Sequence, residues 1–306
     1  MSEYNNNCDH CNENCTGNCE TCQETECNHD CANCSENTGG CNHDCANCSE
    51  DCSGRIEKAV PTTDTKIGKV IAVLSGKGGV GKSMVTSLLA VELAKAGYSV
   101  GILDSDITGP SIPKIFGLNG QLYGDEIGIF PAETKLGIKA ISVNMMLEEE
   151  DDPVLWRGPI LGNVVKQFYS EVHWGELDYL LIDMPPGTSD VAISIFQLLP
   201  VDSVVMVTTP SKLVSMVVGK AINMAAQVNL PIVGLVENMA YVKCDNCGNS
   251  INIYNNDDTE NVAAKYNLDV VGKLPIDPVL ANLADEGKIE EYDGILLNEL
   301  VKKVTK

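Results

Sequence analysis

Apolar runs and segments of helical spacing alternate along the chain from Lys69 onward. A first apolar run over Lys69–Ser75 is followed by apolar residues of helical spacing over Met84–Lys95. Later apolar runs predict buried strands at Tyr98–Asp104, Leu177–Asp183, Ser203–Thr208 and Ile232–Glu237, with shorter strands over 127–143 and near Val270. The segments between them predict helices at Gly158–His173, Val191–Leu199 and Lys212–Gln227, with two more at the C-terminus. This alternation favours an α/β fold with a doubly wound, mostly parallel sheet.

The first 60 residues lack this pattern. They contain few large apolar residues, no Lys or Arg before Arg55, and many Cys, Asn and acidic residues. Such a segment buries too little apolar surface to offset its chain entropy, so we expect a disordered tail unless metal ligation folds it. The segment also repeats itself, because Cys27–Glu36 recurs as Cys41–Glu50. The predicted organisation is a Cys-rich tail over 1–60 and a compact domain over 61–306.

The segment between the first apolar run and the first helix is the most informative one. It reads Gly76-Lys-Gly-Gly-Val-Gly-Lys-Ser83, which matches G-x-x-x-x-G-K-[ST] in the strand–loop–helix context of a phosphate-binding loop. Its backbone N–H groups and the following helix N-terminus favour an anion. Lys82 is predicted to reach the β- and γ-phosphates of ATP, and Ser83 to bind Mg²⁺. The predicted nucleotide-binding residues are Gly76, Lys77, Gly78, Gly79, Val80, Gly81, Lys82, Ser83 and Met84.

Lys77 is an extra lysine at the start of this loop. A phosphate-binding loop does not need it, and an ordinary solvated lysine is one interpretation. The other is that Lys77 reaches a nucleotide in a facing subunit and neutralises charge in the transition state, as an arginine finger does.

Three aspartates lie at the ends of predicted strands, at the edge of the sheet where the phosphate loop lies. Ligands of open α/β sheets bind beyond the carboxyl ends of the strands. Asp183 is predicted to hold Mg²⁺ through its water shell. Asp106 is predicted to orient the attacking water, and Asp104 to support the magnesium site. The alternative for each is an ordinary carboxylate in a turn.

The net charge of the chain argues against two classes of binding partner. The net charge is −22, from 43 acidic and 21 basic residues. Binders of nucleic acid or anionic membranes usually carry a basic face, so we expect neither partner. No apolar run reaches 18 residues, and the first residues lack the basic and apolar regions of a signal peptide. A cytoplasmic location is the default expectation.

Cysteine usage points to metal or redox chemistry. In a chain without an export signal, 14 cysteines favour metal ligation over disulfides. Cys244 and Cys247 form a C-x-x-C pair after the strand ending at Asn238, which is half of a tetrahedral zinc site or half of the thiolates of a cubane cluster. A redox pair or an inert loop is also open. A two-fold dimer would bring four thiolates together.

The other twelve cysteines lie between Cys8 and Cys52. Cys41, Cys45, Cys48 and Cys52 form a four-thiolate set, and three further cysteines lie near His29. Thiolates bind zinc, copper(I) and iron–sulfur clusters alike, so the tail predicts a metal without identifying it.

Taken together, these motifs resemble the Mrp/ApbC family of iron–sulfur cluster carrier ATPases, relatives of partition ATPases, MinD and the nitrogenase iron protein. The resemblance covers about residues 66 to 304. It rests on the loop with Lys77, Asp104–Ser111, Leu181–Gly187, Val236–Met239 and the C-x-x-C.

The resemblance implies a P-loop NTPase fold and a homodimer that encloses ATP, with Lys77 crossing to the partner's phosphate. It also implies a labile [4Fe-4S] cluster bridged between subunits by Cys244 and Cys247. Asn238, Pro275 and Asp277 match positions near the adenine in this family.

The sequence departs from the family pattern at two places. Asp245 and Asn246 stand inside the C-x-x-C, where the family commonly has proline. Scaffold members carry an N-terminal C-x13-C-x2-C-x5-C motif. Cys31, Cys45 and Cys48 match its first part, but Cys52 comes two residues early. The tail is therefore predicted to bind a second cluster or zinc, or to act as a thiol-rich metal store.

The sequence thus predicts a slow ATPase that accepts a [4Fe-4S] cluster from a scaffold protein and passes it to apo-proteins. The alternative is a MinD- or ParA-like positioning or partition ATPase acting on a membrane or DNA surface. A basic amphipathic C-terminal helix would favour that alternative. The segment 295–306 is only mildly amphipathic, and we expect it to dock on the core.

Overall fold

The computed structural model describes residues 58–106, 111–118, 122–124, 128–146, 158–244, 246–254 and 259–306. The predicted Cys-rich tail, with Cys31, Cys45, Cys48 and Cys52, lies outside the described residues.

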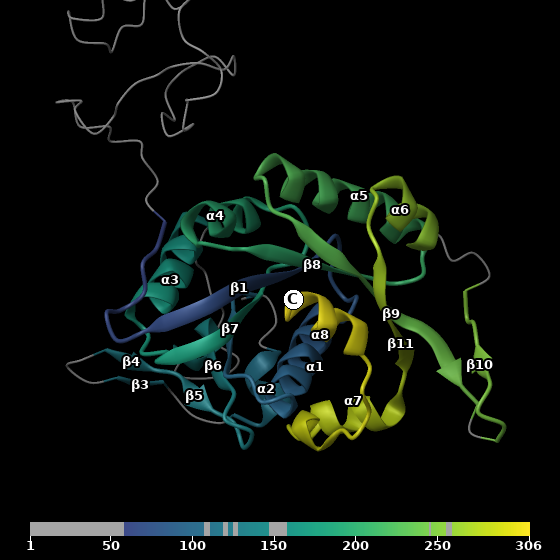
Figure 1. Cartoon of the computed structure of the whole chain (residues 1–306), viewed down its shortest axis with the longest axis horizontal. Helices are drawn as coiled ribbons and strands as arrows, with labels where there is room; N and C mark the ends of the chain where they lie inside the picture. The colour runs from purple at the N-terminus through teal and green to yellow at the C-terminus, as the bar shows by residue number, and fades with distance from the viewer. Residues whose placement is uncertain are drawn as a thin grey trace, which may run out of the picture. The chain divides into compact units, whose positions relative to one another are not determined.

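A mostly parallel sheet runs through the described domain (Figure 1). Its strands lie in the order β10-β9-β8-β1-β7-β2-β6-β5, and β11 also pairs with β9. Only the pairs β9–β10 and β5–β6 of this sheet are antiparallel. The strands are β1 Lys66–Ser75, β2 Val100–Asp104, β5 Ala132–Glu133, β6 Lys139–Ser142, β7 Glu176–Asp183, β8 Ser203–Thr208, β9 Ile232–Lys243, β10 Ser250–Ile251 and β11 Val270–Ile276. A separate pair is formed by β3 Tyr123–Gly124 and β4 Ile129–Phe130.

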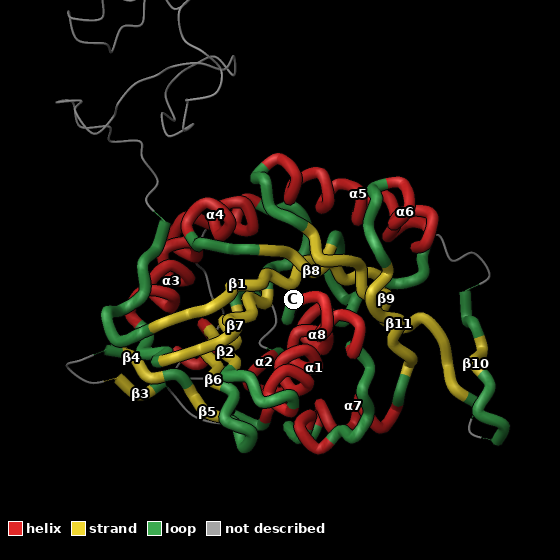
Figure 2. The backbone as a smooth tube through the Cα atoms, viewed as in Figure 1, coloured by secondary structure: helices red, strands yellow, loops and turns green. Residues whose placement is uncertain are grey.

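Helices cover both faces of the sheet, as Figure 2 shows. One group contains α1 Lys82–Lys95, α2 Ile112–Phe116, α7 Pro278–Asp285 and α8 Asn298–Val304. The other contains α3 Gly158–Glu171, α4 Asp190–Leu198, α5 Lys212–Gln227 and α6 Thr259–Lys265. Short 3-10 turns lie at Val143–Met146 and Ile289–Glu291. The expected α/β fold with a doubly wound parallel sheet is confirmed.

The central strands are buried on both faces, which explains their continuous apolar runs. In β1 the last six residues are all buried, and β2 is buried throughout. The C-terminal helix α8 packs Leu300 and Val304 into the same core, and the Lys69 ammonium donates to the Val304 carbonyl at 2.9 Å. The expected docking of the C-terminal segment is confirmed.

Strand β9 is longer than its sequence pattern indicates. We expected it to end near Asn238, before a polar insertion, but it continues to Lys243. Lys273 of β11 pairs with Glu237, and Pro275 pairs with Tyr241, so β9 contains two extra residues between these pairs. Met239 within this bulge has a φ of 57°. The strand continues because β11 and β10 supply backbone partners that its polar sequence does not reveal.

Candidate functional site

The loop between β1 and α1 exposes its backbone. Gly79 and Gly81 have φ values of 78° and 79°, a region that L side chains rarely occupy. A Cβ on Gly79 would meet no atom within 4 Å, and one on Gly78 would meet only the Pro186 side chain at 3.8 Å. Gly76 lies against α5, where a Cβ would come within 2.8 Å of the Val217 backbone. The loop therefore faces open space on one side and is held tightly on the other.

Helix α1 begins directly behind this loop. Gly81 is its N-cap residue and supplies no side-chain cap, and the first turn carries no acidic residue. The first N–H groups of a helix lack intrahelical acceptors, and the helix dipole places partial positive charge there. An anion at this terminus would supply the missing acceptors, so the geometry fits a phosphate group.

Lys82, Ser83 and Asp183 meet at this helix start. The Lys82 ammonium lies 2.8 Å from Asp183 Oδ1 and 3.5 Å from Asp106 Oδ2. Ser83 Oγ donates to Asp183 Oδ2 at 2.5 Å. They meet because β1 and β2 both flank β7, which ends at Asp183. The structure thus brings together the four residues predicted to bind phosphate and magnesium and to orient water.

The Lys82 ammonium is buried, with a side chain 5% exposed. Its contacts with the two carboxylates are ion pairs, and among the described residues it has no hydrogen-bond acceptor of good geometry. A buried ammonium in this situation has N–H groups available for phosphate oxygens.

Lys77, by contrast, has an exposed side chain, and its carbonyl accepts a hydrogen bond from Ser75 Oγ at 3.0 Å.

Asp104 lies behind Asp183 and away from solvent. Its carboxyl accepts hydrogen bonds from Ser142 Oγ and from the Asp106 N–H, both at 3.1 Å. Burial, with the neighbouring Asp183 carboxylate as second cause, raises the pKa of Asp104 to about 8. The group is therefore mostly protonated at neutral pH. The predicted contribution of Asp104 to a magnesium site remains a prediction.

Sequence reasoning missed three hydroxyl groups of this site. Thr86 Oγ1 donates to Asp183 Oδ1 at 2.9 Å, and Ser105 Oγ donates to the Asp183 carbonyl at 2.7 Å. The third is Ser142, which contacts Asp104. Thr86 follows Ser83 by three residues on one helix face, a spacing that could have identified it. Ser142 is brought in by the β2–β6 pairing, for which the sequence offers no motif.

Asn238 connects the phosphate loop to β9. Its side-chain amide donates to the Val80 carbonyl at 2.9 Å, and a Cβ on Gly81 would lie 2.1 Å from the same nitrogen. Its side-chain oxygen accepts from the Met239 N–H at 2.9 Å. The β9 bulge places Asn238 beside the phosphate loop, and its predicted position near the adenine remains a prediction.

Asp277 has a structural role that the sequence did not indicate. As N-cap of α7 it accepts hydrogen bonds from the N–H groups of Val279 at 2.8 Å and Leu280 at 3.3 Å. Its other oxygen accepts from the Tyr292 hydroxyl at 2.9 Å. Pro275 pairs with Tyr241 at the end of β11. The predicted nucleotide contacts of Asp277 and Pro275 remain predictions.

Cys244 and Cys247 lie on the turn that joins β9 to β10. The Cys244 N–H donates to the Asn249 carbonyl at 2.9 Å, and the Gly248 N–H donates to the Cys244 carbonyl at 2.8 Å. Within the described residues, neither cysteine is part of a disulfide. Cys244 is half-buried and Cys247 is exposed. In the ranges that the structure describes, no group of three or more His, Cys, Asp or Glu side chains is arranged to hold a metal ion. The pair can therefore supply two ligands of a larger site.

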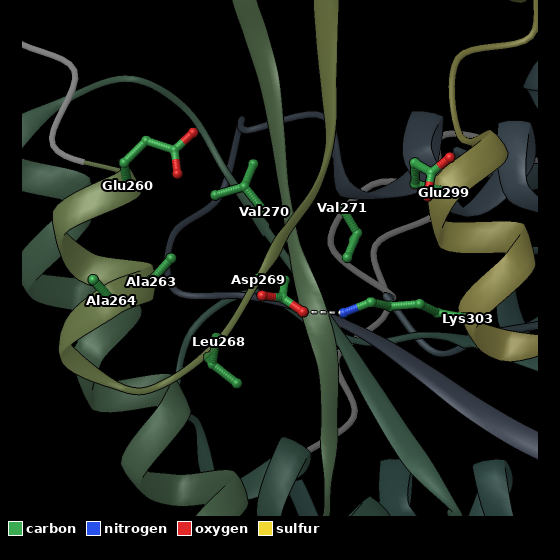
Figure 3. A pocket seen from close by; sticks show the side chains of 9 residues that line it. All are labelled: Glu260, Ala263, Ala264, Leu268, Asp269, Val270, Val271, Glu299 and Lys303. Atoms are coloured by element: carbon green, nitrogen blue, oxygen red, sulfur yellow. Dashed lines mark hydrogen bonds and ion pairs between the residues drawn. The ribbon is translucent and has the colours of Figure 1, made fainter.

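A cavity of about 460 Å³ lies elsewhere, between α6, β11 and α8 (Figure 3). Apolar side chains such as Leu268 and Val271 line it, and an ion pair of 2.5 Å joins Asp269 and Lys303 beside them. No residue of the phosphate loop lines this cavity.

Within the described part of the chain, no helix combines the length and apolar character needed to cross a bilayer.

Comparisons with known proteins agree with this geometry. A family model described as ParA, NUBPL iron-transfer P-loop NTPase, matches residues 66–306. An iron–sulfur cluster carrier protein of Clostridium perfringens is 46% identical over 249 residues, covering 79% of this chain and 87% of that protein. One of Methanococcus maripaludis is 39% identical over 277 residues and covers 90% of each chain.

Solved structures share the fold of this chain. A nucleotide-binding protein of Archaeoglobus fulgidus in complex with ADP has a TM-score of 0.67 and 44% identity, covering 74% of this chain and 90% of that one. The cell division ATPase MinD of Pyrococcus furiosus has a TM-score of 0.56 at 21% identity, covering 78% and 98%, which shows a shared fold. The chain therefore belongs to the NUBPL iron-transfer P-loop NTPase family, together with iron–sulfur cluster carrier proteins.

Proposed function

We propose that this protein is an ATP-dependent carrier that accepts a [4Fe-4S] cluster, holds it between two copies of the chain, and transfers it to apo-proteins. The main supporting observation is the path of β9. Asn238 of this strand donates to Val80 of the phosphate loop, and five residues after Asn238 the strand ends beside Cys244. One element thus contacts both the nucleotide site and the thiol pair.

The phosphate loop is the proposed ATP site. Its N–H groups and Lys82 bind the phosphates, while Ser83 and Asp183 hold Mg²⁺, which would neutralise charge on the β- and γ-phosphates. Asp106, 3.5 Å from Lys82, orients the attacking water. Asp104 holds the Asp106 backbone through a hydrogen bond and supports this arrangement.

Lys77 is proposed to act on the other copy. Its exposed side chain starts from the open side of the loop, whereas Lys82 is buried at the helix start. A second copy facing this loop would bring Lys77 to the partner's phosphates, where a cation stabilises the charge of the transition state. This role requires a homodimer.

The cluster is the cargo of the protein. Each chain offers the thiols of Cys244 and Cys247, and a [4Fe-4S] cluster takes four thiolates. Two chains related by a two-fold axis supply that number. ATP binding would change the contacts of Asn238 with the loop and, through β9, the position of the two thiols.

The experiment is cluster transfer by the full chain carrying Cys244→Ser and Cys247→Ser. After anaerobic reconstitution, this variant should bind ATP like the wild type and fail to activate an apo-protein that requires a [4Fe-4S] cluster. Lys82→Ala should show the reverse, with cluster binding retained and ATP binding lost. Transfer at the wild-type rate by the double cysteine variant would disprove the proposal.

The alternative of a positioning or partition ATPase receives no support from the C-terminal helix, because α8 packs Leu300 and Val304 into the core. The net charge of −22 also opposes binding to DNA or anionic lipid. Pelleting with anionic vesicles and DNA retardation at moderate salt would test it, and binding in either assay would favour it.

A further inference from the structure

Strand β11 lies at an edge of the main sheet. Among the described strands, only β9 pairs with it, from Val270 to Ile276. An edge strand presents backbone N–H and C=O groups that no neighbouring strand satisfies, and such a row is a template for an added strand. Pro275 near the end of β11 is in keeping with this position, because proline within a sheet is largely confined to edge strands.

Two cavities lie along this edge. The cavity of about 460 Å³ shown in Figure 3 is lined by residues 268–271 of the chain, and a second of about 370 Å³ is lined by residues 270–273. Both are also lined by Glu260 and Glu299, so we treat them as one site and call it the β11 groove. At about 3.3 Å per residue, residues 268–273 span about 17 Å, which is enough for about five residues of an extended peptide.

The walls of the β11 groove leave room beside the strand. Figure 3 shows α6 on one side of β11 and α8 on the other. The α6 wall carries Ala263 and Ala264, whose side chains are small, and Leu268 and Val271 add apolar surface. A peptide added to β11 would point alternate side chains toward the two helices while its backbone bonds to the strand. Main-chain bonds then supply affinity, and the walls supply selectivity.

The exposed charge of the β11 groove is negative. The side chains of Glu260, Asp269 and Glu299 are 65%, 75% and 69% exposed. The ammonium groups of Lys273 and Lys303 belong to side chains only 37% and 35% exposed, and they lie 3.1 Å from Glu260 and 2.5 Å from Asp269. The carboxylates therefore face solvent more than the lysines do, which favours an occupant with basic side chains.

We infer that the β11 groove binds an extended segment of a recipient apo-protein, rich in lysine or arginine, by adding it as a strand to β11. This inference rests on the proposed function and names the recipient's docking site. Neither the phosphate loop nor Cys244 and Cys247 line the groove. A recipient held there keeps a high local concentration near the thiol pair without blocking it.

The probe is a capped, fluorescently labelled hexapeptide that alternates valine and lysine, and fluorescence anisotropy with the full chain at physiological salt measures its dissociation constant. A peptide that alternates valine and glutamate should bind more weakly. The valine–lysine peptide with every backbone nitrogen methylated should also bind more weakly, because methylation keeps the charges and removes the N–H donors that strand addition needs.

Glu299→Lys should raise the dissociation constant of the valine–lysine peptide about fivefold, because an exposed attraction becomes a repulsion. Glu286→Lys on α7 is the matched control. Glu286 is 59% exposed and pairs with Lys288 at 2.8 Å, much as Glu299 pairs with Lys302 at 2.7 Å, and its reversal changes the net charge equally. Ala264→Phe, at an exposed position of the groove wall, should weaken peptide binding by filling space. All three variants should bind ATP like the wild type.

The inference is overturned if the wild-type chain does not bind the valine–lysine peptide, or if the methylated peptide binds equally well. Equal weakening by Glu299→Lys and Glu286→Lys would also overturn it, since it would indicate attraction by net charge alone. Each of these results leaves the proposed function intact as long as the Cys244→Ser, Cys247→Ser chain fails to transfer a cluster. Transfer by that chain at the wild-type rate would instead disprove the proposed function, whatever the peptide does.

Discussion

Asp183 is the residue on which the side chains of the proposed nucleotide site converge. Its carboxylate accepts from Ser83 and Thr86 and pairs with Lys82, and its carbonyl accepts from Ser105. These donors fix the direction of the carboxylate before a ligand arrives. A carboxylate oriented in advance binds Mg²⁺ with a smaller loss of side-chain freedom.

Thr86→Val should weaken Mg–ATP binding without unfolding the protein. The substitution keeps the shape of the side chain but removes its hydrogen bond to Asp183, which is 2.9 Å long. The loss of one such bond corresponds to about 1 kcal/mol, or about a fivefold higher dissociation constant. Calorimetric titration with Mg–ATP and with ATP in EDTA measures it. Equal weakening in both titrations would show that Thr86 does not act through the magnesium site.

Asp104→Asn should remove a pH dependence of stability in the nucleotide-free protein. The pKa of Asp104 rises from 3.8 to about 8 in the folded chain, so between these values the folded state holds a proton that the unfolded state releases. Stability therefore falls as pH rises through this window, by up to about 1.4 kcal/mol per pH unit, and levels off above it.

Melting temperatures in EDTA at several pH values between 5 and 9 measure this effect for the wild type and for Asp104→Asn. The difference between the two proteins isolates the group, because all other titrating residues are shared. Parallel curves would mean that Asp104 is ionised in the folded protein throughout this range.

At the scale of elements, the sequence predicted the sheet and the loop but not the reach of β9. The apolar runs of β7 and β8 are long because both faces are buried, and their positions were predicted within one residue. The second half of β9 is polar and bulged, and it is a strand only because β10 and β11 lie beside it. Local patterns cannot show such partners, so the contact between Asn238 and the loop was not derivable from spacing.

Gly81→Ala tests that contact, with Gly97→Ala as control. Both glycines have positive φ values, 79° and 94°, so both substitutions carry a similar backbone penalty of about 1–2 kcal/mol. Only at Gly81 would the new Cβ collide with Asn238, at 2.1 Å, whereas Gly97 has nothing within 4 Å. Gly81→Ala should raise the dissociation constant of ATP at least tenfold, and Gly97→Ala should leave it unchanged. Equal ATP affinity in the two variants would show that Asn238 moves aside freely.

Glu92→Ala should lower the free energy of unfolding by weakening the attachment of the segment before α8. The Glu92 carboxylate accepts hydrogen bonds from the N–H groups of Leu296 and Leu297, at 2.7 and 2.9 Å, just before this helix. Its removal leaves two backbone donors without their acceptor, which costs about 1–3 kcal/mol of unfolding free energy. Urea unfolding measures the loss, and Glu92→Gln, which retains an acceptor, should recover part of it. A loss of the same size in Glu92→Gln would assign the effect to charge.

At the scale of the whole molecule, the cysteines fall into two groups: the C-x-x-C pair of Cys244 and Cys247, and the cysteines before residue 58. Cys244 and Cys247 are placed by a hairpin, and the family resemblance identified them from their spacing after Val236–Met239. The cysteines before residue 58 have no apolar pattern around them, so their sequence can indicate a metal but not a geometry. Residues 1–57 also carry 12 acidic residues and only one basic residue, which favours cations in general.

The full chain with Cys244→Ser and Cys247→Ser separates metal binding by the tail cysteines from metal binding by the C-x-x-C pair. If the tail holds a cluster of its own, anaerobically purified protein should keep iron and sulfide in equal amounts, with the visible absorbance of a cluster. The further change of Cys45→Ser and Cys48→Ser should remove this remainder, because these two residues belong to the four-thiolate set of the tail. Zinc in place of iron and sulfide would identify a zinc site, since four thiolates suit either metal. Protein free of metal after the first pair of changes would assign all cluster binding to the hairpin.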